Sequence, residues 1–282
     1  MPEGHTLHRL ATELSAAFAG RVVRVSSPQG RFADSAALLD GQVLEGAEAW
    51  GKQLFIEFPG ERFIHVHLGL IGKFDVFTDL PEVPLPVGQV RLRLAAAGGA
   101  GRSYADLRGA TACELWTREQ RDAVIARSGP DPIRPDADPM RAWERIRRSK
   151  APIGGLLMDQ KVLAGVGNVY RAELLFRHRM HPLRPGNTLR VGQWQEMWRD
   201  LVELMAEGVR TGRIDTVRPE HTPEAMGRAP RKDDHGGEVY VYRRTGQSCL
   251  VCGTTVRTAV LEGRNLFWCP SCQRRFRSRA VR

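Results

Sequence analysis

Four cysteines near the end of the sequence constrain the fold more than any other feature. They form two Cys-x-x-Cys units, Cys249 with Cys252 and Cys269 with Cys272, separated by sixteen residues. Each unit forms a tight turn that presents two thiolates to one ion, and four soft ligands in a tetrahedral arrangement suit Zn²⁺. A closed shell of four thiolates leaves no open coordination position. The spacing therefore predicts one structural zinc ion that holds a hairpin too small to bury a core of its own.

The remaining composition favours a folded protein outside the membrane. Apolar residues make up 42% of the 282 residues, and no uninterrupted apolar run approaches the length of a membrane span. His5, His8 and Arg9 interrupt the start of the chain, so it lacks the pattern of a secretion signal. We expect a cytoplasmic protein without a membrane partner. The side chains of His5 and His8 are expected to be exposed to solvent.

The positive charge lies in the second part of the chain. Residues 1–115 hold 11 Lys and Arg against 13 Asp and Glu, whereas residues 116–282 hold 31 against 19. A GC-rich genome explains the preference for Arg over Lys, but it does not explain the excess in one half. A basic half-chain of this kind indicates a polyanionic partner, with nucleic acid first.

The pattern of apolar residues changes near residue 117. Residues 6–20 predict a helix that buries Leu7, Leu10, Leu14 and Phe18. Short strands are expected next, in the segments 41–58, 62–68, 72–77 and 90–97. Helices are expected from there on, over 117–132, 138–150, 152–165, 168–180 and 191–212, and the small, cysteine-bearing last segment, from residue 239 on, is strand-like. We expect an α+β protein with an N-terminal β-sandwich and a helical second part.

Two further segments could carry chemistry. Pro2 would become a free secondary amine if Met1 were removed, although terminal sequences usually carry no meaning. The segment "LLMDQKVLAGVGNVYRAELLF" predicts a helix ending at residues 165–167 and a second helix capped by Asn168. Backbone N–H groups at such a junction can bind phosphate, but the junction could equally be an ordinary corner.

These motifs occur together, in this order, in one family. "MPEG" at the start, "GKQLF", "AGVGNVYRAELLF" and the four-cysteine hairpin ending in "CPSCQ" span nearly the whole chain. The sequence resembles the formamidopyrimidine-DNA glycosylase / endonuclease VIII family of base-excision repair enzymes, in its actinobacterial endonuclease VIII-like branch. The resemblance implies a bacterial, nucleoid-associated monomer that binds damaged DNA. It also implies a catalytic sandwich over residues 1–116, a linker over 117–130, a helix–two-turn–helix domain over 131–238, and the zinc finger with a basic tail over 239–282.

The same resemblance implies how the enzyme works. Pro2 would attack C1′ of the damaged nucleotide, Glu3 would carry the proton to the sugar, and Lys52 would contact phosphate or protonate the departing base. Arg264 at the tip of the finger hairpin would bind the phosphate beside the lesion and assist δ-elimination, although it could also be a solvated surface charge. Asn168 and Arg127 match residues that contact the DNA backbone.

The stretch "HVHLGLIGKF" is expected to fill the gap left by the flipped nucleotide. The candidates are His67, Leu70 and Ile71, although Leu70 could be a core residue. Gly69 stands where some endonuclease VIII proteins have a glutamine, so recognition of the opposite base is open. The long polar loop over residues 213–238 lies where family members cover the flipped base.

The resemblance leaves the substrate open. Oxidised pyrimidines are expected, with 8-oxoguanine and formamidopyrimidines as the alternative within the family. A non-catalytic zinc-ribbon DNA-binding protein would also explain the cysteines and the charge, but it gives no reason for Pro2 and Glu3 at the terminus.

Overall fold

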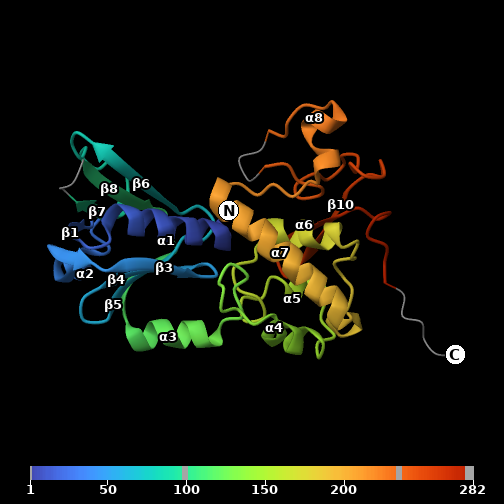
Figure 1. Ribbon diagram of the computed structural model, residues 1–282, viewed down its shortest axis with the longest axis horizontal. Coiled ribbons are helices and arrows are strands. Elements are labelled where there is room, and N and C mark those ends of the chain that lie inside the picture. The colour runs from blue at the N-terminus through green and yellow to red at the C-terminus, as the bar shows by residue number, and fades with distance from the viewer. Residues whose placement is uncertain (1, 97–100, 233–236, 277–282) are drawn as a thin grey trace. The chain divides into compact units, whose positions relative to one another are not determined.

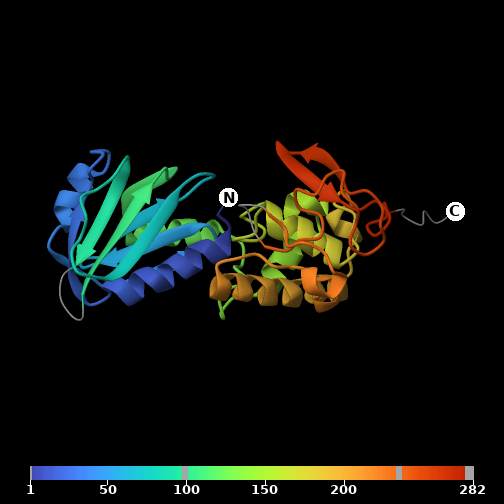
Figure 2. The ribbon, with the colours of Figure 1, turned by 90° about the horizontal axis from the view of Figure 1, so that it is seen from above.

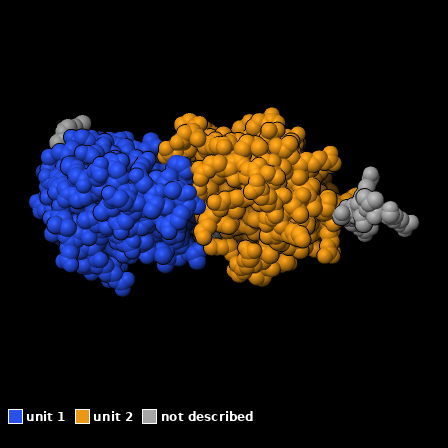
Figure 3. Space-filling view, turned by 90° about the horizontal axis from the view of Figure 1, so that it is seen from below, with its two compact units in different colours: residues 1–127 blue, residues 128–282 orange. Residues whose placement is uncertain are grey.

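The structure is a computed structural model that describes residues 2–96, 101–232 and 237–276. The chain divides into two compact units, Met1–Arg127 and Ser128–Arg282 (Figure 3). The division falls inside the segment 117–130 in which we expect a linker. Across the described ranges, no helix has the length and apolar character needed to cross a bilayer. The last residues of the basic tail, 277–282, lie outside the described part.

Unit 1 is a sandwich of two antiparallel sheets with flanking helices (Figures 1 and 2). The five-stranded sheet has the order β2-β1-β7-β8-β6, and the four-stranded sheet has the order β3-β4-β5-β9. The strands are β1 (Arg21–Ser26), β2 (Gln42–Leu44), β3 (Gly46–Trp50), β4 (Gln53–Phe58), β5 (Arg62–His67), β6 (Lys73–Leu80), β7 (Val90–Ala96), β8 (Arg102–Arg108) and β9 (Ala112–Thr117). The strands expected from the sequence are confirmed; β1, β8 and β9 were not anticipated.

Helix α1 (Gly4–Phe18) confirms the helix expected near the N-terminus and belongs to the core of unit 1. Its apolar side chains repeat every three or four residues, so they share one face, and that face contacts strands of both sheets. Two more helices complete the unit, α2 (Ala33–Leu39) and α3 (Arg118–Arg127). Helix α3 buries none of its residues and lies along β5 and β9.

Unit 2 is helical and carries a β-hairpin (Figure 1). Its elements are α4 (Pro139–Ile146), α5 (Ile153–Leu156), α6 (Asn168–Arg177), η1 (Gly186–Thr188), α7 (Val191–Thr211), η2 (Pro219–His221), α8 (Pro223–Met226), β10 (Arg257–Leu261) and β11 (Arg264–Trp268). Helix α7 buries a stripe of Trp, Met and Leu side chains and ends at Gly212, which adopts the left-handed conformation. These aromatic and Met side chains therefore belong to the core of unit 2.

The helix expected over residues 152–165 is wrong in length. Only Ile153–Leu156 forms a helical turn, and the chain then runs through turns to α6. The side chain of Gln160 forms hydrogen bonds with backbone groups of this segment. Its amide nitrogen donates to the carbonyl of Val166, and its oxygen accepts from the N–H of Gly165. Because these backbone groups are satisfied by a side chain, the segment need not continue as a helix.

The strand-like last segment, from residue 239 on, forms strands at β10 and β11 but not at residues 239–244. The backbone N–H groups of Tyr240, Val241 and Tyr242 donate instead to the carboxylate of Glu173, at 2.7 to 2.9 Å. The hydroxyl of Thr216 donates to the same carboxylate at 2.6 Å. Glu173 is fully buried on α6, so one side chain holds both ends of the long loop that connects α7 to the finger.

Candidate functional site

The N-terminus places an acidic group at the beginning of a helix. Pro2 is partly exposed, whereas Glu3 is fully buried at the N-cap of α1. The backbone carbonyl of Glu3 accepts from the N–H of Thr6 at 2.9 Å, which begins the helix. A helix N-terminus carries partial positive charge, which stabilises a carboxylate and disfavours a protonated amine. Met1 lies outside the described residues.

His5 is buried, contrary to the expectation that it is solvated. It is 5% exposed, and burial lowers its pKa to about 4, helped by the positive charges of His8 and Arg9. The imidazole is therefore uncharged at neutral pH. It adds no positive charge beside Pro2 and Glu3, and we assign it no catalytic role.

Lys52 lies in a turn and not on a strand. Gly51 and Lys52 form the two-residue turn between β3 and β4, and Gly51 has a positive φ of 57°. The carbonyl of Lys52 lies 3.0 Å from Nδ1 of His67, the last residue of β5, so the ring donates to it. The structure thus brings Lys52 and His67 together in unit 1.

The loop between β5 and β6 presents two apolar side chains to solvent. Leu70 is 64% exposed and Ile71 is 80% exposed, so the alternative that Leu70 is a core residue is wrong. The N–H of Gly72 donates to the carbonyl of Leu68 at 3.1 Å and closes the loop. Exposed aliphatic side chains on a closed turn have the shape and chemistry of a wedge between bases.

Asn168 does not cap α6, because Gly167 occupies the cap position. Asn168 is instead the first residue of the helix and is buried, and its side-chain oxygen accepts from the guanidinium of Arg171. The same guanidinium donates to the carbonyl of Asn265 at 2.9 Å and to that of Gly154 at 3.3 Å. Arg171, which the sequence did not single out, thus joins the start of α6 to the finger hairpin.

Arg264 occupies the tip of the hairpin, as expected. It is exposed and pairs with Leu261 across the turn of Glu262 and Gly263. A Cβ on Gly155 would lie 2.9 Å from Oε1 of Glu262, so this glycine leaves room for the hairpin tip beside α5. Arg264 directly precedes Asn265, whose carbonyl accepts the hydrogen bond from Arg171.

Arg127 is the last residue of α3 and of unit 1. Its Nε donates to the carbonyl of Ala123 in the same helix at 3.0 Å, and its side chain is exposed. Pro2, Glu3, Lys52, His67, Leu70, Ile71 and Arg127 belong to unit 1, and Asn168, Arg264 and the four cysteines belong to unit 2.

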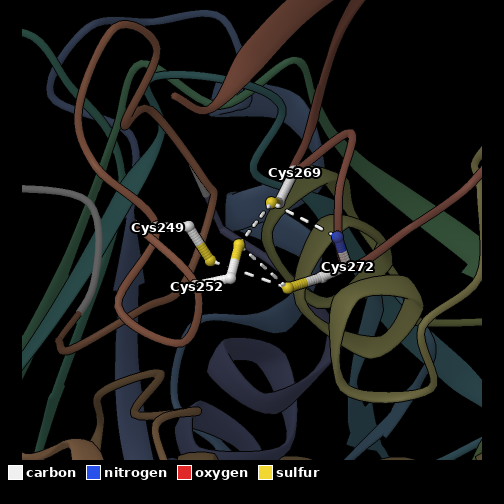
Figure 4. Close-up of side chains that lie close together, drawn as sticks. All are labelled: Cys249, Cys252, Cys269 and Cys272. Atoms are coloured by element: carbon white, nitrogen blue, oxygen red, sulfur yellow. Dashed lines mark hydrogen bonds between the residues drawn. The ribbon is translucent and has the colours of Figure 1, made fainter. Parts of the chain in front are cut away.

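The four cysteines of the predicted zinc site meet at one point (Figure 4). Their sulfur atoms all lie within 4.8 Å of one another. Cys252 lies 3.5 Å from Cys269 and from Cys272, and Cys249 lies 3.9 Å from Cys272. Sulfurs at the corners of a tetrahedron around Zn²⁺ are about 3.8 Å apart, whereas a disulfide needs about 2.05 Å. The donor set and its spacing fit a zinc ion.

Gln273, directly after the last cysteine, fixes the finger to the helical unit. It is fully buried, and its amide nitrogen donates to the carbonyl of Met180 at 2.9 Å. Its side-chain oxygen accepts from the N–H of Cys269, also at 2.9 Å. The sequence offers one signal for this residue, its place in "CPSCQ", but not the partner across the fold.

A β-sandwich followed by a helical unit with a four-cysteine finger is the architecture of a zinc-finger DNA glycosylase. Family models match in chain order: the formamidopyrimidine-DNA glycosylase N-terminal domain over residues 1–113, its H2TH domain over 128–219, and the zinc finger found in FPG and IleRS over 246–275. A solved complex of Lactococcus lactis Fpg with N7-benzyl-Fapy-dG-containing DNA has a TM-score of 0.77 at 22% identity, covering 97% of this chain and all of that chain. That likeness concerns the fold.

Sequence relatives identify the family. The chain is 53% identical to Endonuclease 8 1 of Mycobacterium tuberculosis, over 97% of this chain and 100% of the relative. It is 31% identical to a formamidopyrimidine-DNA glycosylase of Chloroflexus aurantiacus, over 84% and 82%. The chain belongs to the formamidopyrimidine-DNA glycosylase / endonuclease VIII family. It is a DNA glycosylase with lyase activity at abasic sites, which excludes the non-catalytic zinc-ribbon alternative.

Proposed function

We propose that the enzyme excises oxidised bases from DNA through a covalent bond to Pro2. After removal of Met1, the secondary amine attacks C1′ of the damaged nucleotide, and the base leaves with the electrons of the glycosidic bond. The amine also gives up its own N–H proton, and the C1′–O4′ bond of the sugar breaks with O4′ taking a proton, so the product is an iminium ion without an N–H to lose; its positive charge persists and acidifies the 2′ proton. Loss of that proton expels the 3′ phosphate by β-elimination, and a second elimination releases the 5′ phosphate.

Glu3 is the proposed proton carrier. Its buried position beside Pro2 at the start of α1 is the observation that supports this assignment best. A carboxyl group there can protonate the ring oxygen of the sugar, which opens the ring and exposes C1′ to the amine. Lys52 is proposed to contact the phosphate or protonate the departing base, and His67 orients it through the backbone of its turn.

Unit 2 is proposed to bind the DNA backbone. Asn168 and Arg264 would contact phosphates, with Arg264 assisting δ-elimination, and Arg127 would add a further backbone contact. One zinc ion on Cys249, Cys252, Cys269 and Cys272 would hold the finger that carries Arg264.

Leu70, Ile71 and His67 would fill the gap when the lesion flips out. The enzyme would act as a monomer on damaged DNA in the bacterial cytoplasm.

Borohydride trapping tests the covalent step. Borohydride reduces the iminium, so the enzyme should become attached to a duplex that carries an abasic site. A variant with one extra residue before Pro2 has no amine at the right position, and its trapping should disappear. Pro2→Gly keeps a primary amine and should keep part of the activity. Undiminished trapping of the extended variant would contradict the assignment.

Oxidised pyrimidines are the proposed substrates because the 53% identical relative is an endonuclease VIII. Oxidised purines are the second candidate, supported by the relatives named formamidopyrimidine-DNA glycosylase. Base release from duplexes with thymine glycol or dihydrouracil should exceed release from 8-oxoguanine duplexes by at least tenfold. The reverse order would assign the enzyme to oxidised purines and leave the proposed chemistry intact.

A further inference from the structure

The loop between β5 and β6, which carries Leu70 and Ile71 and is called the wedge loop below, has a glycine at position 69. The space beside this glycine is filled by a residue of the turn between β8 and β9. Gly69 has a φ of +69°, and a Cβ built there would lie 1.9 Å from Oγ1 of Thr111. It would also lie 3.1 Å from Cβ of Thr111. Real atoms do not approach so closely, so the hydroxyl of Thr111 occupies the position from which a residue-69 side chain would project.

Thr111 sits in the turn between β8 and β9, and that turn is held firmly. The guanidinium of Arg91 donates to the carbonyl of Ala110 at 3.3 Å and to that of Cys113 at 3.2 Å, on either side of Thr111. A Cβ on Gly109 would lie 3.5 Å from the carbonyl oxygen of Ile71, so the turn packs directly against the wedge loop. The hydroxyl of Thr111 is therefore placed by a fixed frame.

This hydroxyl is available to an external group. Thr111 is exposed, and within the described residues its side chain makes no hydrogen bond. It lies beside Gly69, next to the exposed side chains of Leu70 and Ile71, which have no hydrogen-bonding group.

We propose that Thr111 supplies the hydrogen bond to the base opposite the lesion. The proposal rests on the wedge role proposed for Leu70 and Ile71. When a nucleotide flips out, the base opposite loses its pairing partner, and a donor or acceptor left unsatisfied at a closed interface costs binding energy. An aliphatic wedge cannot satisfy that base. A threonine hydroxyl both donates and accepts, and it rotates to suit its partner.

A rotatable hydroxyl predicts weak discrimination among opposite bases. Every base presents at least one donor or acceptor on its pairing edge, and Thr111 can match either kind. We therefore expect the rate at an abasic site to vary only a few-fold between adenine, cytosine, guanine and thymine as the opposite base.

The test compares wild type, Thr111→Val and Thr111→Ser in single-turnover cleavage of duplexes with one aldehydic abasic site. This lesion is cleaved whichever damaged base the enzyme prefers. The site is placed opposite each of the four bases, and opposite a tetrahydrofuran residue, which has no base. Thr78→Val, on exposed residue 78 of β6, is the matched control.

Thr111→Val should lower cleavage or affinity about fivefold opposite each base, the value of one hydrogen bond. The loss should vanish opposite tetrahydrofuran, and Thr111→Ser should restore the rate. An equal loss with and without an opposite base, or no loss anywhere, would overturn the proposal. Failure of the catalytic assignment has a different signature, because wild type would then not be trapped by borohydride.

Discussion

Replacement of Glu173 by Gln is predicted to destabilise unit 2. The Glu173 carboxylate is fully buried and accepts four hydrogen bonds, two on each oxygen. Every partner is a donor. Glutamine keeps one oxygen and replaces the other with an NH₂ group, which also donates.

The magnitude follows from counting the donors that lose their acceptor. Turned toward Val241 and Tyr242, the NH₂ group faces two N–H donors; turned toward Thr216 and Tyr240, it faces only the N–H of Tyr240, because the hydroxyl of Thr216 can rotate to accept. A buried donor without a partner costs about 1 to 3 kcal/mol, so the variant should lose about 1 to 3 kcal/mol of unfolding free energy in the less costly orientation. Thr216 and the N–H of Tyr240 share one oxygen, whereas Val241 and Tyr242 share the other. Both orientations therefore remove at least one hydrogen bond from the segment Tyr240–Tyr242.

Urea unfolding followed by tryptophan fluorescence measures this loss. Four of the six tryptophans lie in unit 2, so the signal reports chiefly on that unit. Glu224→Gln, on exposed residue 224 of α8, is the matched control and should change stability by less than about 0.5 kcal/mol. A loss below about 1 kcal/mol in the Glu173 variant would refute the assignment of the carboxylate as the anchor of the segment.

Three further outcomes are expected. Burial lowers the pKa of His65 to about 4, from 6.5 when unfolded. The unfolding free energy that depends on the neutral ring is therefore intact above pH 6.5 and falls by about 3 kcal/mol in all as the pH drops toward 4. Urea midpoints measured against pH should show this fall, and His65→Phe should flatten the curve. Cys269→Ser should lower the zinc content measured by a chromophoric chelator and weaken DNA binding; unchanged values of both would contradict the metal site. Gly69→Ala should lower the thermal midpoint more than Gly20→Ala does, because both have similar positive φ but only Gly69 would meet Thr111; equal losses would show that the contact is unimportant.

The sequence predicted features that depend on short spacing. Two Cys-x-x-Cys units placed four sulfurs within 4.8 Å, and the periodic leucines of residues 6–20 formed α1. Prediction from the sequence failed where a side chain that is not visible in the local pattern takes the backbone hydrogen bonds of a segment. Gln160 replaces helical hydrogen bonds after α5, and Glu173 prevents a strand at residues 239–244 by taking its N–H groups. Periodicity contains no information about such partners.

The candidate site divides in the same way. The exposure of Leu70 and Ile71 and the hairpin position of Arg264 agree with the motifs, whereas the roles of Pro2 and Glu3 stay predictions. Thr111 could not be found, because its relation to Gly69 exists only after β5 and β9 pair. The contact of Arg171 with the hairpin could not be predicted from the sequence, because its acceptor, the carbonyl of residue 265, lies 94 positions away.

Helix α6 shows what signal was nevertheless present. Nine of its ten residues are buried, and two of those nine, Arg171 and Glu173, are charged in isolation. A buried charge is costly unless it is paired or hydrogen-bonded, so charges within an apolar helix require partners. Residues two positions apart point about 200° apart around a helix, which sends these two to opposite sides. Arg171 holds the hairpin that carries Arg264, and Glu173 holds the segment that leads into the finger. One buried helix thus makes two attachments of the finger, in addition to the one made by Gln273, and both come from residues that are charged in isolation.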